Sequence, residues 1–215
     1  MKYLAYLFDL NGTIIDDMQF HARVWHEILT KELGSKISYE ETVLQMYGKN
    51  SELLERVFGK GHFTIQEMDE LSLRKEKSYQ EVYLPHLKLI DGLADFLENA
   101  HQKGIKMAIG SAAIPFNIDF VLDNLKIRKY FPVVVSANDV VLSKPHPETF
   151  TKCADLLGLS YAKCLVFEDA PKGVESASNA GMDCVAITTL HEPEDFSKSN
   201  HIVKWISDYK NLALL

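Results

Sequence analysis

The residues best suited to chemistry lie near the start of the chain, where an apolar run gives way to polar side chains. Tyr3 to Phe8 is nearly all apolar or aromatic, and Asp9 and Asn11 follow it directly. Such a run is typical of a parallel strand buried on both faces, and ligands bind at the carboxyl edge of parallel sheets. A turn rich in Asp, Asn and Gly would also explain these residues. The segment alone leaves both interpretations open.

Three later apolar runs are also followed by polar residues, namely Ser111, Lys144 and the pair Glu168 and Asp169. Because the carboxyl ends of parallel strands meet at one edge, we expect these groups to share a site with Asp9. A carboxylate nucleophile, a hydroxyl, an ammonium group and an acidic pair for a divalent cation are the parts of phosphoryl transfer through an aspartyl-phosphate. Singly, each could be a helix cap or a solvated loop residue. Their convergence is what favours a catalytic site.

The elements that must position these groups follow two patterns. After the opening strand and up to Tyr83, the chain shows only helical patterns, beginning with an apolar stripe between Met18 and Leu33. From Pro85 onward, short apolar strands alternate with helices, which is typical of right-handed βαβ units and a parallel sheet. The strands predicted there are residues 105–109, 133–135, 164–167 and 183–187, and the helices are residues 93–103, 115–124, 147–157 and 173–180.

The predicted fold class is therefore α/β, a Rossmann-like parallel sheet core with an inserted all-helical cap domain. We expect residues 1–16 and 86–215 to form the core and residues 17–85 to form the cap domain. Within the latter, Ser38-x-x-Glu41 predicts a helix that begins with a capping box.

The composition excludes several classes of partner. The net charge of -7 implies no general attraction to nucleic acid or to an anionic membrane. The 3 cysteines are far apart and fit neither a disulfide framework nor a zinc site, which favours reduced thiols and a cytoplasmic location. No apolar run approaches the roughly 20 residues that cross a bilayer. We expect a soluble monomer that acts on a small phosphorylated molecule.

The four polar segments resemble, in order and along the whole chain, the motifs of the haloacid dehalogenase (HAD) superfamily. Within it the chain is similar to β-phosphoglucomutase-like members, which carry a helical cap after the first motif. The resemblance implies that Asp9 is the nucleophile, that Ser111 binds phosphate and that Lys144 bridges the two. It also implies Mg²⁺ as cofactor. The implied metal ligands are Asp9, Glu168, Asp169 and the main-chain carbonyl of Asn11.

Substrate contacts are implied by the same resemblance. Lys49 after Gly48, Lys75 in Lys75-x-x-x-Tyr79, and His21 match cap positions near the substrate. Charged helix residues mostly lie on solvated faces, so a surface role for these lysines stays open, and Trp25 is expected in the core. Thr13 is expected to support the first loop by hydrogen bonding. The substrate-binding residues expected in this way are Thr13, His21, Lys49, Lys75, Ser111 and Ala112.

Asn11 is the main departure from the family pattern, which has a second aspartate at this place as general acid and base. An amide has no titratable proton, and losing this catalysis costs about 10² to 10⁴ in rate. We therefore expect magnesium and phosphate binding with slow turnover. Three explanations are open: a laboratory substitution, a natural residue in a chain that uses another group such as His21, or a catalytically silent module that binds a phospholigand.

Ala113 and Ile114 are a second departure, because β-phosphoglucomutase-like chains carry polar donors there for a distal phosphate. This favours hydrolysis of a phosphate monoester, such as a sugar phosphate, or of pyrophosphate, with a sugar phosphomutase as the alternative. A nucleotide-dependent oxidoreductase is disfavoured, because no Gly-x-Gly-x-x-Gly follows a predicted strand.

Overall fold

The computed structural model describes residues 2–196 and 201–215. Residues up to Asp16 and from Lys88 onward form one compact unit, and Asp17–Leu87 form a second. The second boundary lies two residues after the one expected at 85/86. In the part of the chain that the structure describes, no helix combines the length and the apolar character that crossing a membrane requires.

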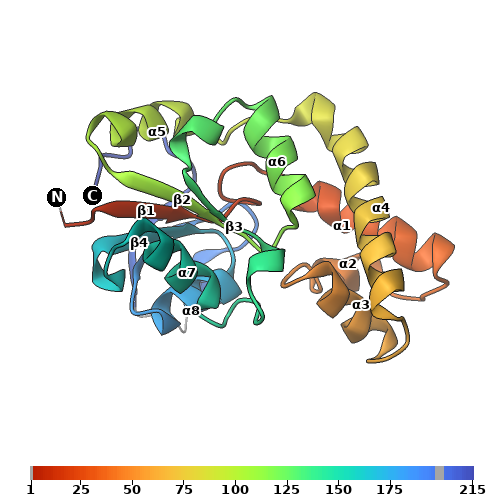
Figure 1. The fold of residues 1–215 in the computed structure, drawn as a ribbon. Coiled ribbons are helices and arrows are strands. Elements are labelled where there is room, and N and C mark those ends of the chain that lie inside the picture. The colour runs from red at the N-terminus through yellow and green to blue at the C-terminus, as the bar shows by residue number, and fades with distance from the viewer. Residues whose placement is uncertain (1, 197–200) are drawn as a thin grey trace. The chain divides into compact units, whose positions relative to one another are not determined.

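The first unit is built on a parallel sheet of six strands in the order β3-β2-β1-β4-β5-β6 (Figure 1). The predicted α/β class, with a helical insertion after the first strand, is confirmed. The register pairs Phe8 with Ile109 of β2 and with Phe167 of β4, so Asp9 and Glu168 follow side by side at the carboxyl edge. The strands are β1 (Ala5–Phe8), β2 (Lys106–Gly110), β3 (Val133–Val135), β4 (Cys164–Glu168), β5 (Asp183–Ile187) and β6 (Ile202–Ile206).

Helices cover both faces of this sheet. The helices α5 (Leu93–Gln102) and α6 (Pro115–Asn124) lie on one side, and α7 (Glu148–Leu157) and α8 (Pro171–Asn179) on the other (Figure 1). Short helical turns complete the connections at Arg128–Tyr130, Ala137–Asp139, Tyr161–Lys163 and Pro193–Phe196.

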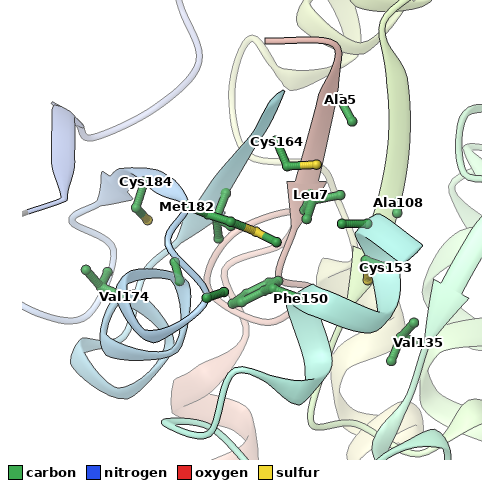
Figure 2. Packing of buried hydrophobic residues seen from close by; sticks show 14 of the residues in the cluster. Ala5, Leu7, Ala108, Val135, Phe150, Cys153, Cys164, Val174, Met182 and Cys184 are labelled. Carbon is green, nitrogen blue, oxygen red and sulfur yellow. The ribbon is translucent and has the colours of Figure 1, made fainter. Parts of the chain in front are cut away.

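Alternation along the strands gives the two faces different packing, because successive side chains of a strand point to opposite sides. Leu7 of β1 packs with Phe150 of α7 and Met182 in a cluster of mostly aliphatic residues (Figure 2). The neighbouring Tyr6 and Phe8 point the other way, into an aromatic cluster. We define the aromatic cluster as Tyr6, Phe8, Phe96, Phe167 and Tyr209. Each ring contacts at least two others, with ring centroids 4.6 to 6.5 Å apart in these contacts.

The second unit, Asp17–Leu87, is helical throughout. The stripe that predicted one helix from Met18 to Leu33 forms an α-helix that continues as a π-helical turn. The predicted capping box is confirmed, since the main-chain N–H groups of Ser38 and Glu41 each donate to the other's side chain. The helices are α1 (Met18–Glu27), the π-helical turn Ile28–Glu32, α2 (Tyr39–Val43), α3 (Asn50–Phe58), α4 (Ile65–Tyr83) and the 3-10 turn Leu84–His86.

Candidate active site

The loop after β1 packs directly against Asp169, the residue that follows β4. The main-chain N–H of Asp9 still donates to the carbonyl of Phe167 (3.0 Å), as in the sheet. The chain then turns at Gly12, whose φ of 79° lies in the left-handed region. A Cβ on Gly12 would lie 2.1 Å from Asp169 Oδ2, so a larger residue would displace that carboxylate. The hydroxyl of Thr13 donates to Asp169 Oδ1 at 3.0 Å.

Lys144 joins the ends of β1 and β4 through a buried ion-pair network. Its Nζ lies 2.5 Å from Asp9 Oδ1 and 2.7 Å from Glu168 Oε1. The three residues are 8%, 7% and 2% exposed, so solvent screens their charges only weakly. The structure thus brings together the polar residues that follow β1 and β4 with the lysine of the loop before α7.

Side chains from α7 and α8 hold the loop that carries Lys144. They hydrogen-bond its main chain on both sides of the lysine, which limits where the ammonium group can lie. The bonds run from Val141 N and Leu142 N to the Glu148 carboxylate (3.0 and 2.9 Å), from Ser176 Oγ to His146 O (2.7 Å) and from Asn179 Nδ2 to Pro145 O (2.9 Å).

Glu168 is positioned by the first turn of α8. Its Oε2 accepts from the main-chain N–H of Ala170 at 2.8 Å. Gly173 lies against the same carboxylate, and a Cβ there would lie 1.7 Å from Glu168 Oε1. A side chain at this helical position therefore has no room unless Glu168 moves.

The site holds more buried negative charge than Lys144 offsets. Burial raises the pKa of Asp9 to about 7, against the opposing effect of Lys144. Burial, reinforced by Glu168 and Asp9, also raises the pKa of Asp169 well above its ordinary range. Burial would lower the pKa of Lys144, but the two carboxylates beside it outweigh that effect and raise it. Three buried carboxylates against one ammonium group favour the binding of a further cation.

These residues fit a divalent cation such as Mg²⁺. Among the described residues, no three His, Cys, Asp or Glu side chains gather closely enough to hold a metal alone. Mg²⁺ does not need such a cage, because it commonly keeps several waters and takes one or two carboxylates together with phosphate oxygens of the substrate. Burial raises the pKa of both Asp9 and Asp169. A bound cation would offset the negative charge of these two carboxylates.

Ser111 follows β2 at the same edge of the sheet and is 1% exposed. Its main-chain N–H donates to Val135 O at 2.9 Å, and its hydroxyl accepts from the N–H of Ala113 at 3.1 Å. Ala112, between them, is partly exposed. The described hydrogen bonds of Ser111 are therefore local, and its contact with a phosphate stays a prediction.

The helical unit buries a charged cluster that contains two of the expected substrate ligands. We define the helical-unit network as Asp17, His21, Lys75, Glu76 and Tyr79, all at most 8% exposed. Lys75 Nζ contacts His21 Nδ1 and lies 2.9 Å from Glu76 Oε1. His21 Nε2 lies 3.1 Å from Asp17 Oδ2, which also accepts from the Tyr79 hydroxyl.

Burial and neighbouring charges act on the ionisable groups of this network. Burial lowers the pKa of Lys75, against the effect of Glu76. Burial and Asp17 raise the pKa of Tyr79. Roles for His21 and Lys75 at a substrate stay predictions.

The other two residues singled out in this unit differ in burial. Trp25 is 1% exposed, as expected of a core residue, and its indole N–H donates to Asn50 Oδ1 at 3.3 Å. Lys49 is partly exposed at the start of α3, and its main-chain N–H donates to Glu52 Oε2 at 2.9 Å. A substrate contact of Lys49 stays a prediction.

Several positioning contacts were missed by the sequence analysis. The i, i+4 spacing of Asp17 and His21 on α1 would have placed them on one helix face. Thr189 and Tyr209 were not singled out at all, yet they donate to the carbonyls of Gly12 (2.7 Å) and Thr13 (3.0 Å). No local pattern marks these two, because each contact joins positions more than 170 residues apart.

Comparisons with known proteins identify the family of the chain. The model of a family described as haloacid dehalogenase-like hydrolase matches residues 6–187. An uncharacterized protein of Haemophilus influenzae is 34% identical over 192 residues, which cover 87% of this chain and 92% of that protein. The fructose-1-phosphate phosphatase YqaB of Escherichia coli is 28% identical over 191 residues, covering 88% of this chain and 98% of that protein.

A solved structure shares the fold. The β-phosphoglucomutase of Clostridium difficile superimposes with a TM-score of 0.84 at 24% identity, covering 99% of this chain and 94% of that one. The predicted structural likeness to β-phosphoglucomutase-like chains with an inserted helical unit is thereby confirmed. The family model spans most of the chain, and the relative from H. influenzae is similar over nearly its whole length. The chain belongs to the haloacid dehalogenase-like hydrolases.

Proposed function

We propose that this chain is a Mg²⁺-dependent phosphatase that hydrolyses a small phosphate monoester, such as a sugar phosphate, or pyrophosphate. The observation that carries the proposal is the placement of Lys144 Nζ within hydrogen-bond distance of both Asp9 Oδ1 and Glu168 Oε1. An ammonium group there offsets the repulsion between a carboxylate nucleophile and a phosphate. Family membership and the similarity to a fructose-1-phosphate phosphatase support the same reaction.

In the proposed reaction a carboxylate oxygen of Asp9 attacks phosphorus. The bond between phosphorus and the leaving oxygen breaks as the Asp9–phosphate bond forms, and the leaving oxygen takes up a proton. Water then attacks the aspartyl-phosphate, gives up a proton, and releases inorganic phosphate and the free Asp9 carboxylate. Lys144 and the hydroxyl of Ser111 donate to oxygens of the transferring group, where negative charge accumulates.

Mg²⁺ would be held by the Asp9 and Asp169 carboxylates and the main-chain carbonyl of Asn11. Glu168, the third carboxylate that the resemblance implies, is bonded to Lys144 and to the N–H of Ala170. When bound, it supplies positive charge that brings the anionic substrate and the Asp9 carboxylate together. The chain's own part is to hold these oxygens, which it does through Lys144 and Thr13.

Asn11 is proposed to limit the rate. Its side chain cannot donate a proton to the leaving oxygen or take one from water. Its main-chain carbonyl, which would be the metal ligand, is the same in asparagine and aspartate. Slow hydrolysis of esters with poor leaving groups is therefore expected. The three competing explanations for Asn11 differ in whether a second group, such as His21, carries this proton.

The proposal is tested by a panel of sugar phosphates, other phosphate monoesters and pyrophosphate, assayed for phosphate release with Mg²⁺ or with EDTA. We expect release that requires Mg²⁺ and is lost in Asp9→Asn, with Asp119→Asn as a surface control on α6. Release that persists in Asp9→Asn would exclude Asp9 as the nucleophile. Release that is equal in EDTA would exclude the metal.

A sugar phosphomutase is the second candidate, and the fold shared with β-phosphoglucomutase favours it. Conversion of a hexose 1-phosphate to its 6-phosphate, faster than phosphate release, would establish it. A silent binding module would instead bind phosphate in the presence of Mg²⁺ and release none, with no gain in Asn11→Asp.

A further inference from the structure

The carbonyls of the loop after β1 are held by donors from three distant parts of the same unit. Gly12 O accepts from Thr189 Oγ1 at 2.7 Å, and Thr13 O accepts from the Tyr209 hydroxyl at 3.0 Å. The next carbonyl, that of Ile14, accepts from the main-chain N–H of Ile90 at 2.9 Å. Three consecutive peptide groups therefore have their orientation set from outside the loop.

The peptide group before these three carries the carbonyl of Asn11. This group is oriented through its N–H, which belongs to Gly12. The N–H of Gly12 donates to Ile15 O at 2.7 Å. In a trans peptide the N–H and C=O point in opposite directions, so the Asn11 carbonyl points away from Ile15. The loop thus aims the one main-chain oxygen that the proposed metal site needs.

Tyr209 is well suited to hold this arrangement, because its ring cannot shift easily. It is 2% exposed and packs in the aromatic cluster, with ring centroids 5.5 Å from Phe96 and 5.9 Å from Phe167. Its main-chain N–H donates to Asp91 O at 2.9 Å. The hydroxyl of a ring held in this way is a fixed donor to Thr13.

Thr13 connects Tyr209 to the Asp169 carboxylate. While its carbonyl accepts from Tyr209, its side-chain hydroxyl donates to Asp169 Oδ1 at 3.0 Å. A displacement of the Thr13 main chain would therefore move the donor that orients Asp169. The chain of contacts runs from the C-terminal segment, through one residue, to a carboxylate of the proposed metal site.

We propose that Tyr209 is a positioning residue of the cation site, which acts through Thr13 on the Asp169 carboxylate. Thr189, which holds the adjoining carbonyl of Gly12, is a second support. This inference rests on the proposed function, since it concerns the affinity of the same site for Mg²⁺. Partners that orient metal ligands typically contribute 10- to 100-fold to metal affinity.

The matched control is Tyr6, another tyrosine of the aromatic cluster. It also loses one hydrogen-bonded hydroxyl when changed to Phe, but that hydroxyl bonds the main chain of Leu215 (2.9 and 3.2 Å). Tyr6→Phe therefore removes a buried hydroxyl from the same cluster without touching the loop after β1.

Isothermal titration of each metal-free protein with MgCl₂ alone is the test, together with thermal unfolding in EDTA. Because Tyr209 reaches the ligand Asp169 only through Thr13, we expect Tyr209→Phe to weaken Mg²⁺ binding by about 3- to 10-fold, up to the lower end of the effect of a direct partner. Tyr6→Phe should weaken it by less than about 2-fold, with a similar loss of thermal stability. Thr189→Val should weaken binding in the same direction, and Thr189→Ser, which keeps the hydroxyl, should restore it. If Tyr209→Phe does not fold, the Thr189 pair decides the outcome.

Two results would overturn the inference, and they are distinguishable. Wild-type affinity in both Tyr209→Phe and Thr189→Val, with Mg²⁺ binding intact in the parent chain, would reject the positioning role alone. Absence of Mg²⁺ binding in the parent chain would reject the positioning role together with the proposed metal site.

Discussion

Asp9 Oδ1 and Lys144 Nζ lie 2.5 Å apart, although 135 positions separate the two residues in the chain. Because Lys144 is buried against Asp9 and Glu168, Lys144→Met should leave two carboxylates without their cation. We expect the free energy of unfolding to fall by about 3–5 kcal/mol at pH 8 in EDTA. At pH 5 the loss should be smaller, because the Asp9 carboxyl group, whose pKa is raised to about 7, can then take up a proton.

Urea denaturation measures this difference. The control is Lys129→Met, which removes a surface lysine whose Nζ lies 3.7 Å from Glu98 and should change stability by less than about 1 kcal/mol. Equal effects of the two substitutions would contradict a buried network centred on Lys144.

The stability of the metal-free chain should depend on pH through Asp9. Burial raises the pKa of Asp9 to about 7, whereas an unfolded chain has an Asp pKa of about 3.9. Between these values the folded state holds a proton that the unfolded state has released, so stability falls as pH rises. In EDTA we expect a higher melting temperature at pH 5 than at pH 8.

Asp9→Asn removes this titration, so the melting temperature in EDTA should vary less with pH. Added Mg²⁺ should stabilise the parent chain more at pH 8 than at pH 5, because protons compete with the metal. Calorimetry at both pH values with Mg²⁺ or EDTA measures each effect. A melting temperature in EDTA that rises from pH 5 to pH 8 would show that Asp9 is not held in its protonated form.

Gly173 gives a prediction opposite to the usual effect of glycine in a helix. Gly to Ala within a helix ordinarily stabilises a protein by about 0.5–1 kcal/mol. Here a Cβ would lie 1.7 Å from Glu168 Oε1, the oxygen that accepts from Lys144. Gly173→Ala should therefore destabilise the chain and weaken Mg²⁺ binding, whereas Ser178→Ala on the same helix should do neither. Titration calorimetry and thermal unfolding of both variants decide this, and a stabilised Gly173→Ala would mean that Glu168 has room to move.

The architecture could be predicted because most of its strands and helices show local sequence patterns. Strands Val133–Val135 and Asp183–Ile187 and helix Pro115–Asn124 match their predicted bounds, since apolar runs and helical periodicity determine such elements locally. Strand β6 (Ile202–Ile206) was missed, because its middle residues are exposed and it shows no buried run. The change from α- to π-helix at Ile28 was missed as well, since a π-helical turn of 5 residues is too short to show a period of its own.

Less of the candidate site than of the fold could be predicted from the sequence. Topology alone predicts that residues after β1, β2 and β4 share an edge, and the register of the parallel strands bears this out for Asp9 and Glu168. What holds them is non-local: the hydroxyl of Tyr209, for example, reaches the carbonyl of Thr13 across 196 positions. Such contacts leave no periodicity or spacing in the sequence, and only the folded chain reveals them.

Lys75 allows a structural role to be separated from a role at the substrate. It is 2% exposed, and its Nζ lies 2.9 Å from Glu76 Oε1 within the helical unit. Lys75→Met should leave the buried Glu76 carboxylate without its ammonium partner and lower the free energy of unfolding by about 3–5 kcal/mol. Lys77→Met, exposed on the same helix, should change stability by less than about 0.5 kcal/mol.

Hydrogen exchange followed by mass spectrometry locates the effect, which should appear first in Asp17–Leu87. A Lys75→Met variant that keeps its stability and protection but shows a raised KM for a phosphate ester would establish a direct substrate contact in place of the structural role.

Asn11→Asp should raise the rate of the proposed hydrolysis. The new carboxyl group can protonate the leaving oxygen and then take a proton from water, so hydrolysis of esters with poor leaving groups should rise by about 10² to 10⁴. Esters with good leaving groups, such as 4-nitrophenyl phosphate, should gain less in their first step because their leaving oxygen needs no proton. The pH–rate profile of Asn11→Asp should show an ionisation that the parent chain lacks, and the double variant Asp9→Asn/Asn11→Asp should be inactive. If Asn11→Asp gains nothing on any ester, either another group such as His21 already moves the proton or the site does not turn over. In the first case His21→Gln lowers the rate of the parent chain, and in the second there is no rate to lower.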